Sequence, residues 1–180
     1  MTHGATIRPL GEDDWAAFQA LRVLATEEAP LAIWPTRDEE AGRSPAEVRA
    51  RIAPTRYQVV LGAFDGTALV AIAGLRREPL AQVAHRATLW GVYVHPGHRR
   101  GGLARGLLGA ACAQARSLGA LQVHLAVNAA NERALALYAA LGFVAYGREP
   151  RTLRVGDTFY DEILMALPLD GDGPGGIRVE

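Results

Sequence analysis

The stretch VHPGHRRGGLARGLL, residues 94–108, joins an apolar run to a leucine-rich one through paired arginines and paired glycines. Glycine pairs cost backbone entropy, so a pair held in this place needs a reason. Residues 87–94 before it, ATLWGVYV, predict a strand. After it, apolar residues recur at helical spacing and Gly119 fits the left-handed position that ends a helix: Leu103, Leu107, Leu108, Ala111, Ala115 and Leu118. The stretch is therefore a strand-to-helix turn.

This turn has the properties of an anion site. The first N–H groups of a helix have no partner within it, and the helix dipole attracts negative charge to them. Glycines let a ligand approach the backbone, and Arg99, Arg100 and Arg105 add cations at the same helix end. One charged hydrogen bond contributes about 1.5–3 kcal/mol, so several would hold a diphosphate. The alternative is a tight turn with solvated arginines.

Two common nucleotide-binding patterns do not fit this turn. Gly97 to Gly102 matches G-x-x-x-x-G, but Leu103 and Ala104 follow where a P-loop has lysine and then serine or threonine. Without that lysine and that hydroxyl, hydrolysis of ATP or GTP is not expected. The dinucleotide fingerprint G-x-G-x-x-G is also absent.

The turn resembles the signature of the GNAT superfamily of N-acetyltransferases, Arg/Gln-x-x-Gly-x-Gly/Ala, which residues 99–104, RRGGLA, match. Residues 131–143, NERALALYAALGF, resemble the family's second motif, Asn-x-x-Ala-x-x-Leu-Tyr-x-x-x-Gly-Phe. The closing segment YDEILMAL is similar to the family's last strand. Two motifs in the right order and at the right separation make the resemblance specific, and it covers residues 5–168.

The resemblance implies that acetyl-CoA is the cosubstrate and implies where it binds. Its pantetheine arm would follow the strand that ends in Val92, Tyr93 and Val94, with a hydrogen bond from Asn131. Its pyrophosphate would rest, with Arg99 nearby, on the backbone amides of Arg100, Gly101, Gly102, Leu103, Ala104 and Arg105. The resemblance also makes Tyr138 the acid that protonates the leaving thiolate.

The residues themselves are compatible with these roles, and each has a structural alternative. A tyrosine with a pKa near 10 is protonated at neutral pH, so Tyr138 can donate a proton without tuning. Its alternative is an aromatic core residue, since Leu135 and Leu141 lie at helical spacing from it. The alternative for Asn131 is an N-cap of the second helix, which is compatible with binding.

Gly91 lies inside the predicted strand 87–94, where glycine often marks a bulge. A bulge would free strand amides for the pantetheine or for the acetyl carbonyl. A backbone N–H near Val92 or Tyr93 would then donate a hydrogen bond to the oxyanion that forms on the acetyl carbonyl during the reaction. The alternative is that Gly91 only relieves crowding beside Trp90.

No general base is evident. A lysine-like amine with a pKa of about 10.4 is only about one part in 2500 neutral at pH 7. An α-amine has a pKa of about 7.7–8.0, so a relay of water molecules could deprotonate it. Strand 87–94 contains no carboxylate. Glu28, in a predicted loop over residues 26–43, and Asp161, in the closing strand, are the candidates. Ordered water is the alternative. Trp34 and the acidic residues of the same loop suit a cationic amine.

The rest of the chain predicts an α+β fold with a mixed, largely antiparallel twisted sheet and helices on both faces, as in the GNAT acyl-CoA N-acyltransferase fold. Strand, helix and strand over residues 87–127 form a parallel crossover unit. The other predicted elements are a strand at 5–10, a helix from Glu12, a helix at 45–53 opened by the Ser44–Glu47 capping box, strands at 57–64 and 67–75 joined by Asp65-Gly66, a helix at 131–141, and strands at 143–149 and 158–167.

We expect one domain over residues 1–168 and a glycine-rich tail over 169–180. A formal net charge of zero argues against a nucleic-acid or membrane-surface partner. The chain has a single cysteine, Cys112, which excludes an intramolecular disulfide. We expect Cys112 to be a small side chain packed in the core. No apolar run reaches the roughly 18 residues of a membrane span, and the N-terminus lacks a secretory pattern. The expected location is therefore cytoplasmic.

The sequence thus predicts an N-acetyltransferase that moves the acetyl group of acetyl-CoA to a primary amine of a small molecule or peptide, by direct attack in a ternary complex. A non-catalytic acyl-CoA sensor and a protein N-terminal or lysine acetyltransferase are the alternatives. No metal is expected, because His95 and His98 have no cysteine or nearby acid to complete a set. Exposed strands are compatible with a homodimer.

Overall fold

The computed structural model of the chain describes residues 4–171. Its strands are β1 (Thr6–Pro9), β2 (Gln58–Asp65), β3 (Ala68–Arg77), β4 (Arg86–Val94), β5 (Gln122–Asn128), β6 (Val144–Val155) and β7 (Thr158–Pro168). Its α-helices are α1 (Trp15–Glu28), α2 (Arg37–Ala41), α3 (Pro45–Ile52), α4 (Leu103–Ser117) and α5 (Glu132–Ala140). Short 3-10 turns cover Glu12–Asp14, Ala81–Val83 and Pro96–His98.

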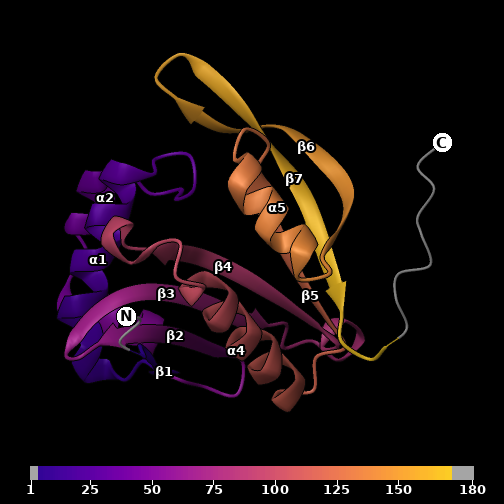
Figure 1. The fold of residues 1–180 in the computed structure, drawn as a ribbon, viewed down its shortest axis with the longest axis horizontal. Coiled ribbons are helices and arrows are strands. Elements are labelled where there is room, and N and C mark those ends of the chain that lie inside the picture. The colour runs from indigo at the N-terminus through magenta and orange to yellow at the C-terminus, as the bar shows by residue number, and fades with distance from the viewer. Residues whose placement is uncertain (1–3, 172–180) are drawn as a thin grey trace.

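The strands form one seven-stranded sheet in the order β1-β2-β3-β4-β5-β7-β6 (Figure 1). Only β4 and β5 are parallel; the other five neighbouring pairs are antiparallel. Helix α4 makes the crossover between the two parallel strands. The predicted α+β class and the predicted crossover unit are therefore confirmed.

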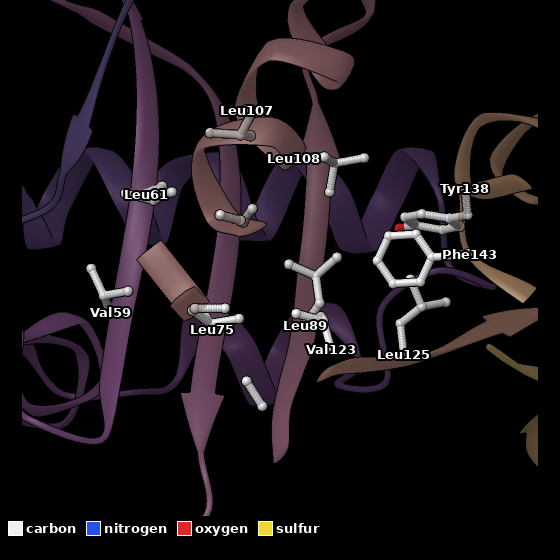
Figure 2. Close-up of a cluster of buried hydrophobic side chains, with 14 of the residues drawn as sticks. Val59, Leu61, Leu75, Leu89, Leu107, Leu108, Val123, Leu125, Tyr138 and Phe143 are labelled. Atoms are coloured by element: carbon white, nitrogen blue, oxygen red, sulfur yellow. The ribbon is translucent and has the colours of Figure 1, made fainter. Parts of the chain in front are cut away.

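Two hydrophobic clusters cover the two faces of the sheet. Side chains such as Leu61, Leu75 and Leu125 pack against α4 and α5 on one face, as Figure 2 shows. On the other face, strand residues such as Val60 and Ile72 pack against Phe18 and Leu21 of α1 and against α3. Alternate strand residues point to opposite faces, so β2, β3 and β4 contribute side chains to both clusters. Helices therefore lie on both faces, as the sequence predicts.

The two parallel strands separate partway along their length. Their register runs from Arg86 opposite Gln122 only as far as Thr88 opposite His124. Both strands continue beyond this point, β4 to Val94 and β5 to Asn128. In Figure 1 they meet at one end and spread apart toward the other. The sheet is therefore split at its centre.

A bulge in β4 lies in this separated part. Tyr93 is opposite Ile72, whereas Trp90 is opposite Gly74, so β4 has one more residue than β3 between the two pairs. Gly91 has φ of +62°. The bulge predicted from Gly91 is therefore confirmed. A Cβ at this position would also lie 3.0 Å from Nη1 of Arg22, so glycine lets this guanidinium approach the strand.

Replacing Gly91 by alanine is expected to lower the free energy of unfolding by about 1–2 kcal/mol, because an L-residue is strained at this φ. Urea denaturation measures the change. The matched control is Gly11→Ala, where φ is −106° and a Cβ would meet nothing within 4 Å. Equal midpoints for the two variants would contradict the assigned strain.

The prediction of a loop over residues 26–43 is confirmed for residues 29–36 and is wrong for residues 26–28 and 37–41. Helix α1 continues to Glu28, and residues 37–41 form α2. The missed signal is a capping box: the Thr36 hydroxyl accepts from the Glu39 amide, while the Glu39 carboxylate accepts from the Thr36 amide at 2.8 Å. The same arrangement at Ser44 and Glu47 opens α3, as predicted.

Strand β6 is longer than the predicted 143–149, because it runs to Val155 and pairs with β7 up to the turn at Gly156. The expected tail over 169–180 lies outside the described residues from 172 onward. In the part of the chain that is described, no helix combines the length and hydrophobicity that crossing a membrane requires.

Candidate active site

The glycine-rich turn opens α4 as expected. Gly102 is the N-cap with φ of +80°, and the first helical bond runs from the Gly106 amide to the Gly102 carbonyl at 3.0 Å. Arg100 has a positive φ of 68°. Arg100, Gly101, Gly102 and Arg105 are exposed, while Leu103 and Ala104 are half-buried. The amides of the first turn therefore begin at an exposed loop flanked by cations, which suits an anion.

The two histidines before the turn have structural partners. The Nδ1 of His95 accepts from the Gly97 amide at 3.2 Å. The Nε2 of His98 lies 3.1 Å from the carboxylate of Asp65, in the β2–β3 turn. Within residues 4–171 no group of three or more histidine, cysteine, aspartate or glutamate side chains is placed to hold a metal ion.

Arg99 ties the turn to α1. Its Nε donates to the Val94 carbonyl at 2.9 Å, and its Nη1 donates to Oε1 of Glu28 at 2.8 Å. Its guanidinium also lies 5.6 Å from the centre of the Tyr93 ring. Hydrogen bonds from Arg99 hold the pKa of Glu28 below its ordinary value, against the effect of burial. A carboxylate held in this way is a weak base, so the structure does not support Glu28 as the base.

A small cavity of about 80 Å³ fills the split between β4 and β5. It is lined by the bulged part of β4, including Val92, by the half of β5 that does not pair with β4, and by Asn131 and Tyr138 of the α5 segment. The predicted strand and second-motif residues therefore meet in one place, although they are far apart in sequence. Tyr93 itself is buried in the hydrophobic cluster on the other face of the sheet. The carbonyl of Val94 accepts a hydrogen bond from Arg99.

Tyr138 serves as a core residue and also lines this cavity. Its side chain is only 8% exposed, and its ring packs edge-on against Phe143 at 5.6 Å between centroids (Figure 2). Burial raises the pKa of Tyr138 to about 12. The hydroxyl is therefore firmly protonated at neutral pH. Both interpretations of Tyr138 made from the sequence are compatible with this position.

Two asparagines also line the small cavity. Asn131 is the N-cap of α5, since its Oδ1 accepts from the Ala134 amide at 3.1 Å. Asn128, which the sequence did not indicate, is 3% exposed, and its Oδ1 accepts from the Ala130 amide at 2.9 Å. Its Nδ2 is buried without a partner among the described residues, so a donor is available for a ligand in the cavity.

A larger cavity of about 910 Å³ lies on the α1 side of the bulge. Elements from both ends of the chain line it, including α1, α3, the loop that carries Trp34, and the middle of β4. Trp90, Gly91 and Glu162 line both cavities. The two spaces therefore meet at the β4 bulge, and Glu162 lies at their junction.

Glu162 has the properties of a general base. It is 5% exposed, and its Oε1 accepts from the Trp34 indole N–H at 3.2 Å. Its Oε2 is buried and has no partner among the described residues. One carboxylate oxygen is thus fixed, while the other is available to a ligand in the cavities. Trp34, predicted as a substrate contact, is placed at this carboxylate and lines the larger cavity.

The sequence indicated Asp161, one residue before Glu162. Asp161 accepts from Nε of Arg148 at 2.8 Å and from the Arg151 amide at 2.9 Å, and it lines neither cavity. These hydrogen bonds hold the pKa of Asp161 below its ordinary value. Asp161 therefore stabilises the β6–β7 hairpin and is not placed to act as the base.

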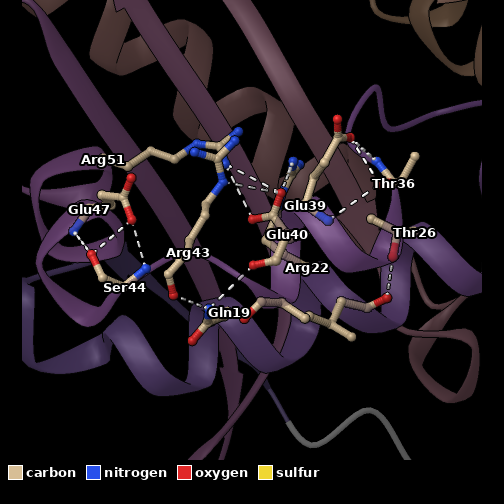
Figure 3. A network of polar contacts seen from close by, with 12 residues as sticks. Gln19, Arg22, Thr26, Thr36, Glu39, Glu40, Arg43, Ser44, Glu47 and Arg51 are labelled. Atoms are coloured by element: carbon tan, nitrogen blue, oxygen red, sulfur yellow. Dashed lines mark hydrogen bonds and ion pairs between the residues drawn. The ribbon is translucent and has the colours of Figure 1, made fainter.

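The acidic residues near Trp34 do not offer the expected site for a cation. Glu39 caps α2, and Glu40 is fully buried with Nη2 of Arg22 at 3.0 Å and Nη1 of Arg51 at 3.2 Å (Figure 3). Glu40 is therefore already paired inside the protein and does not face an incoming amine, whereas Glu39 lines the larger cavity while it completes the capping box of α2.

Comparison with known proteins gives a consistent result. The model of the Acetyltransferase (GNAT) family matches residues 18–143. The [ribosomal protein bS18]-alanine N-acetyltransferase of Escherichia coli K12 is 36% identical over 87 residues, which are 48% of this chain and 59% of the relative. The chain therefore spans about three fifths of the length of the curated relatives that it matches.

Solved structures match over nearly the whole chain. One is yncA from Salmonella typhimurium, solved with its cofactor acetyl-CoA, at a TM-score of 0.80 and 25% identity over 93% of this chain and 95% of that one. Another is the ribosomal-protein-alanine N-acetyltransferase of Brucella melitensis, at a TM-score of 0.76 and 28% identity over 91% of this chain and 99% of that one.

Proposed function

Because the chain belongs to the GNAT family of acetyltransferases, we propose that it transfers the acetyl group of acetyl-CoA to a primary amine. The acceptor is a small molecule or a peptide, and it attacks directly in a ternary complex. The observation that carries this proposal is the split between β4 and β5, whose small cavity is lined by both Tyr138 and Glu162.

The α4 turn and the residues of the split suit different parts of acetyl-CoA. The amides of residues 100–105 would hold its diphosphate, with Arg100 and Arg105 adding positive charge. Arg99 would act indirectly, because its bonds to the Val94 carbonyl and to Glu28 fix the shape of the turn. The pantetheine arm would follow Val92 into the small cavity, beside Asn131. Acetyl-CoA supplies the acetyl thioester.

Two side chains would carry out the proton transfers. The free oxygen of Glu162 takes a proton from the attacking amine as its nitrogen bonds to the acetyl carbon. A strand amide near Val92 or Tyr93 donates to the carbonyl oxygen while that oxygen carries negative charge. Tyr138 gives its phenolic proton to the sulfur as the carbon–sulfur bond breaks. The products are an acetamide and free CoA.

Mass spectrometry after incubation with acetyl-CoA and a panel of amines tests the proposal. Gain of one acetyl group on an amine at an enzymatic rate supports it. Tight CoA binding with no acceptor in a broad panel would overturn it and support the non-catalytic acyl-CoA sensor instead. A cytoplasmic location remains part of the proposal, and the homodimer remains a prediction that light scattering tests.

A protein N-terminus is a second candidate acceptor, favoured by similarity to the bS18-alanine N-acetyltransferases. An α-amine with a pKa of about 7.7–8.0 is also far easier to deprotonate at neutral pH than a lysine side chain. Peptides that begin with alanine therefore belong in the acceptor panel, beside free small amines and lysine peptides.

Replacing Gly102 by alanine is expected to weaken CoA binding about tenfold, because φ of +80° is strained for an L-residue and the turn would reshape. Calorimetry with CoA measures the change. The control is Gly109→Ala in α4, where a Cβ meets nothing within 4 Å and alanine stabilises a helix. Unchanged CoA affinity in Gly102→Ala would argue against the diphosphate position.

A further inference from the structure

Three arginines surround one buried carboxylate beside the larger cavity. Oε2 of Glu40 lies 3.0 Å from Nη2 of Arg22, and its Oε1 lies 3.2 Å from Nη1 of Arg51. Nε of Arg43 lies 3.9 Å from the same Oε2. Figure 3 shows the ends of the Arg43 and Arg51 side chains converging beside Glu40. We call Arg22, Arg43 and Arg51 the arginine cluster.

The cluster has more donors than Glu40 can satisfy. Three guanidinium groups share one carboxylate as their ion-pair partner. Arg22 is only 2% exposed, and both its Nε and the Nε of Arg43 are buried without a hydrogen-bond partner among the described residues. Burial and the neighbouring arginines lower the pKa of Arg51. These unpartnered guanidinium N–H groups therefore favour a ligand with acceptor oxygens.

The other carboxylates that line the cavity form no ion pair or hydrogen bond with the arginine cluster among the described residues, so they do not use its free donors. Glu39 and Glu47 line the same cavity, but each is occupied as the capping residue of its own helix. Each accepts from the backbone amide of its N-cap, at 2.8 Å for Glu39 with Thr36 and 2.7 Å for Glu47 with Ser44. The remaining carboxylate, Glu162, is bonded to Trp34.

The cluster lies within the same space as the reacting centre. All three of its arginines line the larger cavity, as do Gly91 and Glu162. Arg22 reaches the β4 bulge itself, because Gly91 has no Cβ to block it. Arg51 stacks over the Trp90 ring at 5.0 Å. One cavity thus presents arginines from α1, α3 and the segment between α2 and α3, and a free carboxylate oxygen from β7.

We propose that the arginine cluster binds an oxyanion on the acceptor, so that the acceptor is an amine that also carries a carboxylate or a similar anionic group. This inference rests on the proposed acetyltransferase function and narrows its substrate. The amine would face Glu162 and the anion would face the arginines, which bind carboxylates in paired hydrogen bonds. A cavity of about 910 Å³ has room for a free amino acid or for the end of a peptide.

The test compares matched acceptors on the wild-type protein. A free amino acid is set against its amide and its decarboxylated amine, and an acidic peptide is set against the same peptide with a neutral side chain. We expect kcat/KM to be at least about tenfold higher for the acid in one of these pairs. Preference within the free amino acids identifies a small-molecule acceptor, and preference within the peptides identifies an acidic side chain.

Variants then connect the preference to the cluster. Arg43→Gln and Arg51→Gln are expected to lower kcat/KM about tenfold for the preferred acid and to leave the matched neutral acceptor nearly unchanged. Both arginines are partly exposed, at 34% and 25%, so these variants are more tolerable than a change at Arg22. Arg154→Gln, on the β6–β7 hairpin and bonded to Asp157, is the control and should leave both acceptors unaffected.

Binding without turnover separates failure of this inference from failure of the proposed function. The N-acetylated acid, which cannot react, should bind the CoA-loaded protein by calorimetry, and should bind at least about tenfold more weakly to Arg51→Gln. Acetylation of neutral amines with no advantage for any acid would overturn the oxyanion site and leave the acetyltransferase standing. Binding of CoA without acetylation of any amine would overturn the acetyltransferase itself.

Discussion

Replacing Glu162 by glutamine is expected to lower kcat/KM for acetyl transfer by about 100-fold or more at neutral pH, with CoA affinity unchanged. Glutamine keeps the size of the side chain and an oxygen that can accept from the Trp34 indole N–H. It replaces the other oxygen by an NH2 group, so the side chain loses its negative charge and its ability to take a proton. The variant therefore tests the base without removing a contact of the fold.

The effect should depend on pH in a definite direction. The wild-type enzyme needs a base because most amine acceptors are protonated at pH 7. As the pH rises toward the pKa of the acceptor, more amine is neutral in solution, and the deficit of Glu162→Gln should shrink. Rates measured from pH 6 to pH 10 provide the comparison.

Asp161→Asn is the matched control, since it changes the neighbouring acid on the same strand. Asp161 is bonded to Arg148 and to the Arg151 amide, so its loss should affect the stability of the hairpin and leave kcat unchanged. If Asp161→Asn lowers kcat as much as Glu162→Gln does, the assignment of the base is wrong.

Local signals in the sequence were sufficient to predict most of the fold. Gly66, Gly119 and Gly142 end elements where they were expected to, and all three have positive φ. Each of these positions needs a backbone conformation that glycine adopts at low cost, so the residue type alone identifies it. The error over residues 26–43 was also local, because the Thr36 and Glu39 capping box was present in the sequence and was missed.

The base could not be assigned in the same way, although part of the signal was present. Ile163, Met165 and Leu167 belong to or pack against the cluster on the α4 side, so strand alternation places Glu162 on the opposite face, toward α1. What the sequence could not show is which acid is already paired. Asp161 is neutralised by Arg148 from β6, a contact that depends on the register of the hairpin.

The arginine cluster depends even more on tertiary structure. Arg22, Arg43 and Arg51 come from α1, from the segment before Ser44 and from α3, and Glu40 comes from α2. In the sequence, Glu40 belongs to an acidic run that suits a cation. In the folded chain it is fully buried and paired with Arg22 and Arg51, so it is not presented to an incoming amine.

Replacing Tyr138 by phenylalanine is expected to lower kcat about 100-fold and to leave the dissociation constant of CoA unchanged, because only the acid for the departing sulfur is lost. The ring and its packing against Phe143 remain. Stopped-flow kinetics and calorimetry with CoA measure the two quantities. Tyr146→Phe is the control: its hydroxyl lies 3.2 Å from Nδ1 of His124, and it lines neither cavity. Full turnover in Tyr138→Phe would refute the assigned acid.

The raised pKa of Tyr138 adds a second, independent result. Its pKa is about 12 in the folded protein and about 10 in an unfolded chain, so folding favours the protonated phenol. The resulting stabilisation is fully present below pH ~10 and is lost as the pH rises toward 12. Phenylalanine has no proton to lose. The urea midpoint of Tyr138→Phe should therefore rise relative to the wild-type midpoint above pH ~10. A constant difference between the two proteins across this range would mean that Tyr138 is not the buried phenol described here, and the same phenol could not then be held protonated to serve the thiolate.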